Sequence, residues 1–147
     1  MKTELPLNDD RMFLNALDQQ VGGSHYKSGR GGVQPVEFSE RNRLPFCMAN
    51  AIKYLYRYKL KGGTIDLEKA VHYCELAMSM YTPSGDSTGW VIEPSEFAKS
   101  NKFNATEAAI LTALCGVYSY GLSGYVEAHK RLNILLKHEK KIKPRSR

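Results

Sequence analysis

The sequence predicts an all-α protein, a small helical bundle built from two helical hairpins that follow a glycine-rich N-terminal loop. Apolar residues recur every three or four positions, most clearly over residues 67–81, which is the spacing of one helix face. No segment shows the long alternation of apolar and polar residues that is typical of strands, and stretches rich in glycine and proline separate the helical segments. With 147 residues, 42% of them hydrophobic, the chain is long enough to bury a core of its own.

The N-terminal part is predicted to be a leader followed by a loop. Residues 1–22 form the leader, with a short helical piece around DRMFLNALDQQV. The next residues, 23–36, hold four glycines and one proline, so we expect a loop there. This loop opens a predicted helical core that extends over residues 23–83.

Two prolines and a glycine pair mark the helices of the first hairpin. Pro35 and Pro45 suit the start of a short helix and of a longer helix over residues 46–61, because a missing N–H does no harm there. Gly62 and Gly63 are expected to end the longer helix, since glycine adopts the left-handed conformation of a helix C-terminus without strain.

The second helix of this hairpin is predicted to begin at Thr64, whose hydroxyl can cap it, and to run to about Tyr81. Asp66 lies in its first turn, where the helix dipole favours negative charge. After it we expect a linker loop over residues 84–103, a second helical hairpin over residues 104–140 and a basic tail over residues 141–147.

A weak repeat links the two hairpins. The segments YRYKLKG (56–62) and YSYGLSG (118–124) share the pattern Tyr-x-Tyr-x-Leu-x-Gly at a predicted helix end. The match arises either by chance or from duplication of a hairpin. If it reflects duplication, the first hairpin is the working half and the second a scaffold, because the second has no counterpart of Lys53, Arg57 or Asp66.

The composition disfavours several classes of protein. No apolar run approaches the 18 residues of a membrane span, and the N-terminus MKTELPLNDDRMF lacks the apolar stretch of a signal peptide. We therefore expect a cytoplasmic protein that does not engage a membrane. Cys47, Cys74 and Cys115 are scattered among apolar neighbours without the spacing of a zinc site or a disulfide framework, so buried thiols are expected.

The formal net charge of +6 is unevenly distributed. Residues 137–147 carry six Lys and Arg against one Glu, and residues 23–83 carry nine against five Asp and Glu. The basic C-terminal end predicts at most a weak, salt-sensitive contact with nucleic acid. The excess within residues 23–83 is more informative because part of it follows one helix.

That helix carries a polar stripe. Asn50, Lys53, Arg57 and Lys61 recur along one side of it, and residues 44–64 contain no acidic residue. The stripe fits a solvated face, a nucleic-acid patch, or one wall of a pocket for a phosphorylated small molecule. Arg offers a bidentate fork to phosphate oxygens and Lys a point charge, so anion binding is chemically sound.

The tyrosines beside the stripe favour a compact pocket over nucleic acid. Tyr54, Tyr56 and Tyr58 lie on different sides of the predicted helix and do not make a row for stacking successive bases. Across the glycine turn, Asp66 can hold a metal ion or orient a hydroxyl group, or it can simply stabilise the first turn of its helix.

Other motifs are weak. The segment GSHYKSGRGG (23–32) lacks the GxxxxGK[ST] pattern of a phosphate-binding P-loop, and it can serve either as a flexible lid over a ligand or as a plain surface loop. The sequence also lacks the paired acidic motifs that hold magnesium in all-α nucleotide pyrophosphohydrolases.

Four segments occur in a specific order: SHYK (24–27), VQPVEF (33–38), FCMANAIKYLYRYKLKGG (46–63) and DLEKAVHY (66–73). Together they resemble a small bacteriophage family that includes the early nucleotide kinase of T-odd phages. The resemblance covers about residues 23–81 and rests on the combination of SHY, NxIKYxxRY and DLxKAxxY. Ala49 stands where the family pattern has Gly, and His72 replaces a common aromatic residue.

The resemblance implies a helical enzyme that transfers a phosphoryl group from a nucleoside triphosphate to a nucleoside or deoxynucleoside monophosphate. It implies a homo-oligomer that acts in the host cytoplasm during phage infection. For a kinase we expect Mg²⁺ and no organic cofactor, with Asp66 either binding the metal or orienting a cation. The residues assigned to catalysis are Lys53, Arg57, Asp66 and Lys69. With Lys61 added from the stripe, those assigned to nucleotide binding are Ser24, His25, Tyr26, Gln34, Asn50, Tyr54, Lys61 and Tyr73.

Three functions remain open at this point. The first is a nucleoside monophosphate kinase in which Lys53, Arg57 and Lys69 neutralise the transferring phosphoryl group. The second is a protein that sequesters a nucleotide, such as a signal made by host defence, without turnover. The third, a relative of the helical pyrophosphohydrolases, has the least support because the acidic magnesium cage is missing.

Overall fold

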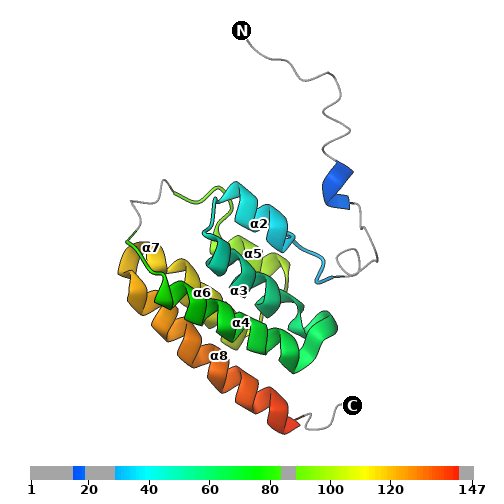
Figure 1. Ribbon diagram of the computed structural model, residues 1–147. Helices are drawn as coiled ribbons and strands as arrows, with labels where there is room; N and C mark the ends of the chain where they lie inside the picture. The colour runs from blue at the N-terminus through cyan, green and yellow to red at the C-terminus, as the bar shows by residue number, and fades with distance from the viewer. Residues whose placement is uncertain (1–14, 19–28, 84–88, 143–147) are drawn as a thin grey trace.

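The computed structural model describes residues 15–18, 29–83 and 89–142, and within these ranges every regular element is helical. The predicted all-α class is thereby confirmed (Figure 1). The elements are a 3₁₀-helix (Asn15–Asp18), α2 (Pro35–Arg41), α3 (Phe46–Arg57), a π-helix (Tyr58–Gly62), α4 (Gly63–Ser79), α5 (Pro94–Ser100), α6 (Ala105–Cys115), α7 (Val117–Tyr120) and α8 (Leu122–Ile142).

The long helices pack side by side around one core. In Figure 1, α4 lies between α3 and α8, and α6 packs against α8 from behind. The short helices α2 and α5 pack on α3 and α6, respectively. The largest fully buried side chains come from all of these helices except the short α7.

The first hairpin follows the sequence prediction at its prolines and at one glycine. Pro35 opens α2, Pro45 directly precedes α3, and Gly63 has a φ of +58°, a positive value that favours glycine at this turn. The prediction that Thr64 caps the next helix is wrong. α4 begins at Gly63, so Thr64 already lies in the first turn, and Gly62 is the N-cap without a side-chain cap.

The predicted linker loop over residues 84–103 needs correction because α5 lies within it. Pro94 stands in the first turn of α5 and Phe97 is fully buried. Proline both breaks helices and starts them, and here the second effect decides. The second hairpin is present as predicted, with the short α7 at its turn, and α8 continues to Ile142, beyond the predicted boundary at residue 140.

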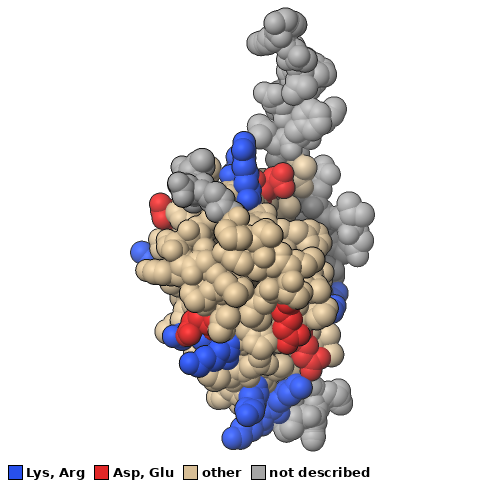
Figure 2. All heavy atoms as spheres, turned by 60° about the vertical axis from the view of Figure 1, so that its left-hand side comes forward, with Lys and Arg blue, Asp and Glu red and all other residues tan. Residues whose placement is uncertain are grey.

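One end of the bundle is mostly uncharged. Figure 2 turns toward the reader the end where α4 finishes and where α7 and α8 begin, and Lys, Arg, Asp and Glu side chains gather mainly at its edges. Phe46 and Met80 are 72% and 62% exposed at this end. They border a hollow of about 330 Å³ whose other walls include Tyr81, Val117 and Tyr125.

The described helices form two units with the same element order. The first unit, residues 29–83, contains α2, α3, the π-helix and α4; the second, residues 89–142, contains α5, α6, α7 and α8. Residues with a positive φ recur at matching places in the two units. Arg43 and Lys102 follow the short helices with φ of +54° and +56°. Gly63, the first residue of α4, and Gly121, directly before α8, have φ of +58° and +70°.

Burial repeats in the same register. Five buried residues of α3 each have a buried counterpart in α6, 59 positions later: Met48, Ala51, Ile52, Leu55 and Tyr56 correspond to Glu107, Ile110, Leu111, Leu114 and Cys115. In α4 and α8 the separation is 58 positions: Asp66, Leu67, Ala70, Cys74 and Ala77 correspond to Gly124, Tyr125, Ala128, Leu132 and Leu135. The Tyr-x-Tyr-x-Leu-x-Gly match therefore indicated a real repeat in the wrong register, since its copies are 62 positions apart.

Two equivalent asparagines hold the units together reciprocally. Asn42, after α2, accepts hydrogen bonds from the N–H groups of Val91 and Ile92 at 2.8 and 3.1 Å and donates to the carbonyl of Ile92 at 3.0 Å. Asn101, after α5, accepts from the N–H of residue 32 at 3.1 Å and donates to the carbonyl of residue 33 at 2.8 Å. Each unit thus binds the segment that directly precedes the short helix of the other.

The rings of Phe38 and Phe97 meet where the units face each other. These residues occupy equivalent positions in α2 and α5, both are fully buried, and their ring centroids are 4.5 Å apart. Direct contact between equivalent residues is what a two-fold relation produces for a pair that lies beside its axis.

Glu107 joins the units and breaks this symmetry. Its carboxylate is fully buried and accepts hydrogen bonds from Arg30 Nη1 at 3.1 Å, the Asn104 N–H at 3.0 Å and the Tyr58 hydroxyl at 2.7 Å, and Lys59 Nζ lies 3.1 Å away. Burial by itself would raise the pKa of Glu107, but the hydrogen bonds from Arg30, Tyr58 and the Asn104 backbone outweigh it and lower the pKa to about 2. Burial and the contact with Glu107 raise the pKa of Tyr58.

We predict that Glu107→Gln lowers the free energy of unfolding at pH 7 by about 3 kcal/mol, because a buried guanidinium then faces an uncharged amide. In the parent protein the stabilisation from Glu107 is complete above its ordinary pKa of 4.5 and is lost as the pH falls toward 2, since the unfolded chain takes up the proton first. Denaturant titrations between pH 7 and pH 2.5 should show a flatter profile for the variant.

Glu127→Gln is the matched control. Glu127 pairs with Arg131 at 2.7 Å on the surface of α8, where both side chains are more than 40% exposed, so less than about 1 kcal/mol should be lost. Equal losses in the two variants would contradict the assigned role of Glu107.

Candidate functional site

Three cationic side chains of the first unit surround one tyrosine ring. The Nζ atoms of Lys53 and Lys69 lie 4.7 and 5.2 Å from the ring centroid of Tyr54, and Cζ of Arg57 lies 5.5 Å from it. All three distances are within the range of cation–π attraction. We call these four residues the cationic cluster.

The helical hairpin brings the cluster together. Lys53, Tyr54 and Arg57 lie on one side of α3, while Ile52 and Leu55 on its other side are fully buried. The turn at residue 63 sends α4 back along α3, and Lys69, two turns into α4, meets the same tyrosine.

Two further aromatic rings continue from the cluster. Tyr73 stacks on Tyr54 with centroids 6.0 Å apart and an interplanar angle of 10°, and it meets Phe46 at 6.1 Å in an edge contact. Tyr54 and Tyr73 are half-buried, whereas Phe46 is exposed. The row leads from the cations to the uncharged end of the bundle.

Asp66 orients Arg57 rather than facing solvent. Its side chain is 1% exposed, and its Oδ2 accepts a hydrogen bond from Arg57 Nε at 3.0 Å. The carboxylate lies so close to Gly62 that a β-carbon there would overlap its carboxyl atoms. Gly62 has an ordinary φ of −86°, so this position needs glycine for space rather than for backbone freedom.

The cluster carries an excess of positive charge. Asp66 offsets Arg57, but among the described residues no carboxylate lies within ion-pair distance of Lys53 or Lys69. A tyrosine face attracts an ammonium group without neutralising it. The cluster is therefore suited to hold an anion with more than one charge.

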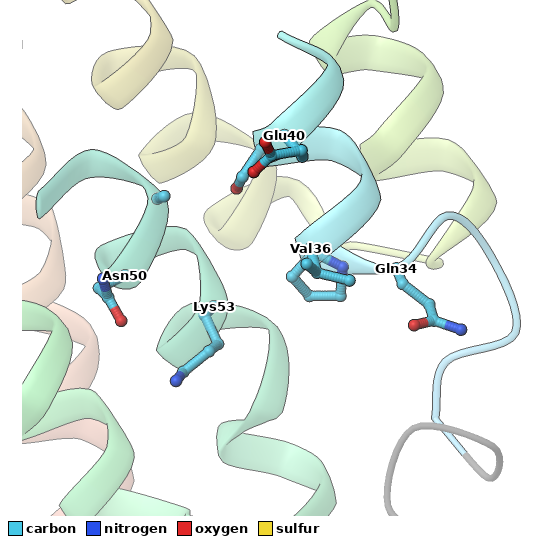
Figure 3. Close-up of a pocket in the computed structure, with 8 residues that line it drawn as sticks. Gln34, Val36, Glu40, Asn50 and Lys53 are labelled. Atoms are coloured by element: carbon cyan, nitrogen blue, oxygen red, sulfur yellow. The ribbon is translucent and has the colours of Figure 1, made fainter. Parts of the chain in front are cut away.

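A groove of about 270 Å³ opens beside the cluster between α2 and α3. Figure 3 shows Asn50 and Lys53 projecting from α3, with Gln34, Val36 and Glu40 on the α2 side. Because Lys53 also lies against Tyr54, it belongs to both the groove and the cationic cluster. Ala49 lines the groove as well.

The polar amides of the groove are partly engaged. Asn50 Nδ2 donates to the Phe46 carbonyl at 2.9 Å, one helical turn earlier. Gln34 Nε2 donates to the Leu17 carbonyl at 2.5 Å, so this side chain ties the 3₁₀-helix to the rim of the groove.

The described residues among the predicted site residues lie at the cationic cluster, in the adjoining groove and, for one of them, in the π-helix. Lys53, Tyr54, Arg57, Asp66, Lys69 and Tyr73 come together around the Tyr54 ring. Gln34 and Asn50 line the groove. Lys61 is exposed in the π-helix, outside both groups. Ser24, His25 and Tyr26 lie outside the described residues.

Sequence reasoning missed several residues of this region. Phe46 begins α3 one turn before Asn50, and Val36, Ser39 and Glu40 line the groove from α2. The spacing of Val36, Ser39 and Glu40 at i, i+3 and i+4 is a helix-face signal, but nothing in the sequence says which neighbour that face meets.

The described residues do not fit a protein-held Mg²⁺ site. Mg²⁺ needs carboxylates with open coordination positions, whereas Asp66 is buried and paired with Arg57. Among the described residues no group of three or more His, Cys, Asp or Glu side chains lies close enough together to hold a metal ion.

The cysteines offer no nucleophile. Cys74 and Cys115 are buried, and burial raises the pKa of each thiol to about 12. Cys47 is half-buried and burial raises its pKa as well.

A family model described as a protein of unknown function, DUF3310, matches residues 21–75. Apart from residues 21–28, the match lies within the first unit and ends inside α4. It includes the whole cationic cluster and both walls of the groove and stops before α5. No curated protein and no solved structure matches the chain.

Within the described ranges, every helix is too short or too polar to cross a lipid bilayer.

Proposed function

We propose that the first unit binds a nucleotide, with its phosphate groups at the cationic cluster. The observation that carries the proposal is the convergence of Lys53, Arg57 and Lys69 on one tyrosine ring, with a carboxylate partner for Arg57 alone among the described residues. Hydrogen bonds between such cations and phosphate oxygens contribute about 1.5–3 kcal/mol each.

The three cations have different tasks in this proposal. Arg57 is held by Asp66 through Nε, which fixes the plane of its guanidinium group before any ligand arrives. Lys53 and Lys69 are long and flexible and rest on the Tyr54 ring. An incoming phosphate draws both ammonium groups away from the ring, because a full negative charge attracts them more strongly than a ring quadrupole does.

The groove between α2 and α3 receives the nucleoside. Its volume of about 270 Å³ suits a nucleobase or a sugar rather than a complete nucleotide. Lys53 stands where the groove meets the cluster, so a ligand whose nucleoside fills the groove brings its phosphate groups to the cations. Pro35, Val36 and Ala49 offer an apolar surface to a base.

The reaction that we propose for this site is transfer of a phosphoryl group from a nucleoside triphosphate to a nucleoside monophosphate. This choice rests on the resemblance of residues 23–81 to the phage nucleotide kinases. Phosphoryl transfer depends mainly on positioning and on neutralising charge, which are tasks that Lys53, Arg57 and Lys69 can perform.

Sequestration of a nucleotide without turnover is the second candidate, and the environment of Asp66 favours it. Asp66 is the one carboxylate paired with the cluster among the described residues, and its burial and its pairing with Arg57 leave it poorly placed to act as a base or a metal ligand. Binding needs the cations alone.

We predict that Lys53→Met and Lys69→Met each weaken nucleotide binding 10- to 100-fold, because each removes one charge-assisted hydrogen bond while keeping an apolar stem of similar length. Isothermal calorimetry against nucleoside mono-, di- and triphosphates measures the loss. A product assay on the same mixtures separates the two candidates, since tight binding without a phosphorylated product means sequestration.

Lys130→Met is the control for these variants. Lys130 is exposed on α8, away from the cluster, and its loss changes the net charge equally. If Lys130→Met weakens binding as much as Lys69→Met does, attraction is diffuse and the cluster is not the binding site.

A separate prediction concerns the groove. Ala49→Leu fills part of it with a larger side chain, so affinity for nucleoside monophosphates should fall at least tenfold. Affinity for inorganic pyrophosphate, which needs the cations alone, should change less than twofold. Equal loss for both ligands would show that the groove does not hold the nucleoside.

The proposal includes a homo-oligomer that forms through the uncharged end of the bundle. At this end Phe46 projects beside a hollow of about 330 Å³ that is lined mostly by apolar and aromatic residues. The projecting side chain and the hollow therefore lie on the same face. A face that carries both can pair with its own copy across a two-fold axis.

Phe46→Glu should dissociate this oligomer, because it buries like charges across the contact. Ile134→Glu on α8, an apolar position that is 61% exposed against 72% for Phe46, should not. Sedimentation equilibrium gives the mass of each. A parent chain that is monomeric at all concentrations tested would rule out the contact.

A further inference from the structure

The second unit contains a place equivalent to the cationic cluster. Residues of α3 correspond to residues of α6 that lie 59 positions later, and residues of α4 to residues of α8 that lie 58 positions later. This alignment follows from the reciprocal asparagines, the matching burial and the matching residues with positive φ. The cluster lies where α3 meets α4. Its counterpart therefore lies where α6 meets α8, two helices that also pack directly on each other.

Every charged or aromatic residue of the site between α3 and α4 is replaced by a different residue at the equivalent position between α6 and α8. On α6, the counterparts of Lys53, Tyr54 and Arg57 are Thr112, Ala113 and Gly116. On α8, the counterparts of Asp66, Lys69 and Tyr73 are Gly124, Glu127 and Arg131.

A cavity supports this alignment independently. A hollow of about 460 Å³ lies between α6 and α8, and all six counterparts line it. In the first unit the equivalent region, between α3 and α4, is filled by the stacked rings of Tyr54 and Tyr73 and the three cations around Tyr54. Small residues in α6 account for the empty volume.

We propose that this hollow is the vacated counterpart of the anion site, so that the chain is a fused pair of like units with one working site. This inference rests on the proposed function for the meaning of the site. The family match over residues 21–75 agrees with it, because the match covers the unit that keeps the cations and omits the unit that lost them.

The backbone between α6 and α8 leaves no room for a counterpart of the Asp66 carboxylate. A β-carbon on Gly124 would lie 2.8 Å from the carbonyl oxygen of Ala113 and 2.9 Å from the backbone N of Val117, so α8 approaches α6 more closely than any carboxylate at this position would allow. Close packing of backbones thus replaces the Arg57–Asp66 ion pair of the first unit. Glu127, in the place of Lys69, pairs with Arg131, in the place of Tyr73, so these two counterparts together carry no net charge.

The test restores the two lysines in the second unit. Thr112 is exposed and Glu127 partly exposed, so the double variant Thr112→Lys with Glu127→Lys leaves the core unchanged. The control, Ser95→Lys with Glu96→Lys on the exposed side of α5, adds the same charge elsewhere. Calorimetry with inorganic pyrophosphate should give one site per chain for the parent and the control and two for the Thr112/Glu127 variant.

A reverse exchange gives a second measurement. Lys53→Thr with Lys69→Glu places the residues of the second unit in the first, and it should abolish pyrophosphate binding while circular dichroism shows unchanged helix content. One site in both the parent and the Thr112/Glu127 variant overturns the equivalence. No site in the parent overturns the proposed function, and with it the inference that rests on it, whatever the variant shows.

Discussion

The buried carboxylate of Glu107 is the contact on which the arrangement of the helices most depends. It lies in the second unit, yet three of its partners, Arg30, Tyr58 and Lys59, come from the first. Arg30 also donates through Nε to the Tyr56 carbonyl at 2.9 Å, so the same guanidinium group holds the end of α3. A carboxylate removed from water with all its hydrogen bonds made tolerates little displacement of its partners. The end of α3 is fixed in consequence, and with it the side of that helix which carries the cations.

The two units divide their tasks through changes at equivalent positions. Where the second unit has Glu107, the first has Met48, so the first unit contributes the cationic partners and the second the acid. The π-helix at the end of α3 places neighbouring side chains in different environments: Arg57 turns to Asp66 and the cationic cluster, while Tyr58 turns inward to Glu107. Reciprocal contacts such as those of Asn42 and Asn101 are present in both units, and each holds a segment of the other unit. The cations have been kept in one unit alone.

Much of the site could be predicted because it lies within one helical hairpin. The spacing of Lys53 and Arg57 on α3, the glycine turn and Asp66 beyond it are local features, and local geometry carries their side chains to the same region. The pairing of Asp66 with Arg57 could not be predicted, since the choice between a free carboxylate and a buried ion pair depends on how closely the π-helix passes α4 at Gly62. α5 was missed because its opening Pro94 resembles the breaks that precede it. The repeat was found in the wrong register because tyrosines are more conspicuous than an equivalent pair such as Met48 and Glu107.

By itself the sequence determined the helical class, the position of the main turn and the identity of the cationic stripe, because helix periodicity, glycine turns and like charges without acidic neighbours act over short stretches of chain. The tertiary structure decided that the stripe meets Lys69 around one tyrosine, that Phe38 meets Phe97, and that Arg30 finds its acid 77 positions away in Glu107. These contacts form between segments far apart in the chain. Their geometry follows from how two like units pack against each other, and no local pattern encodes that packing.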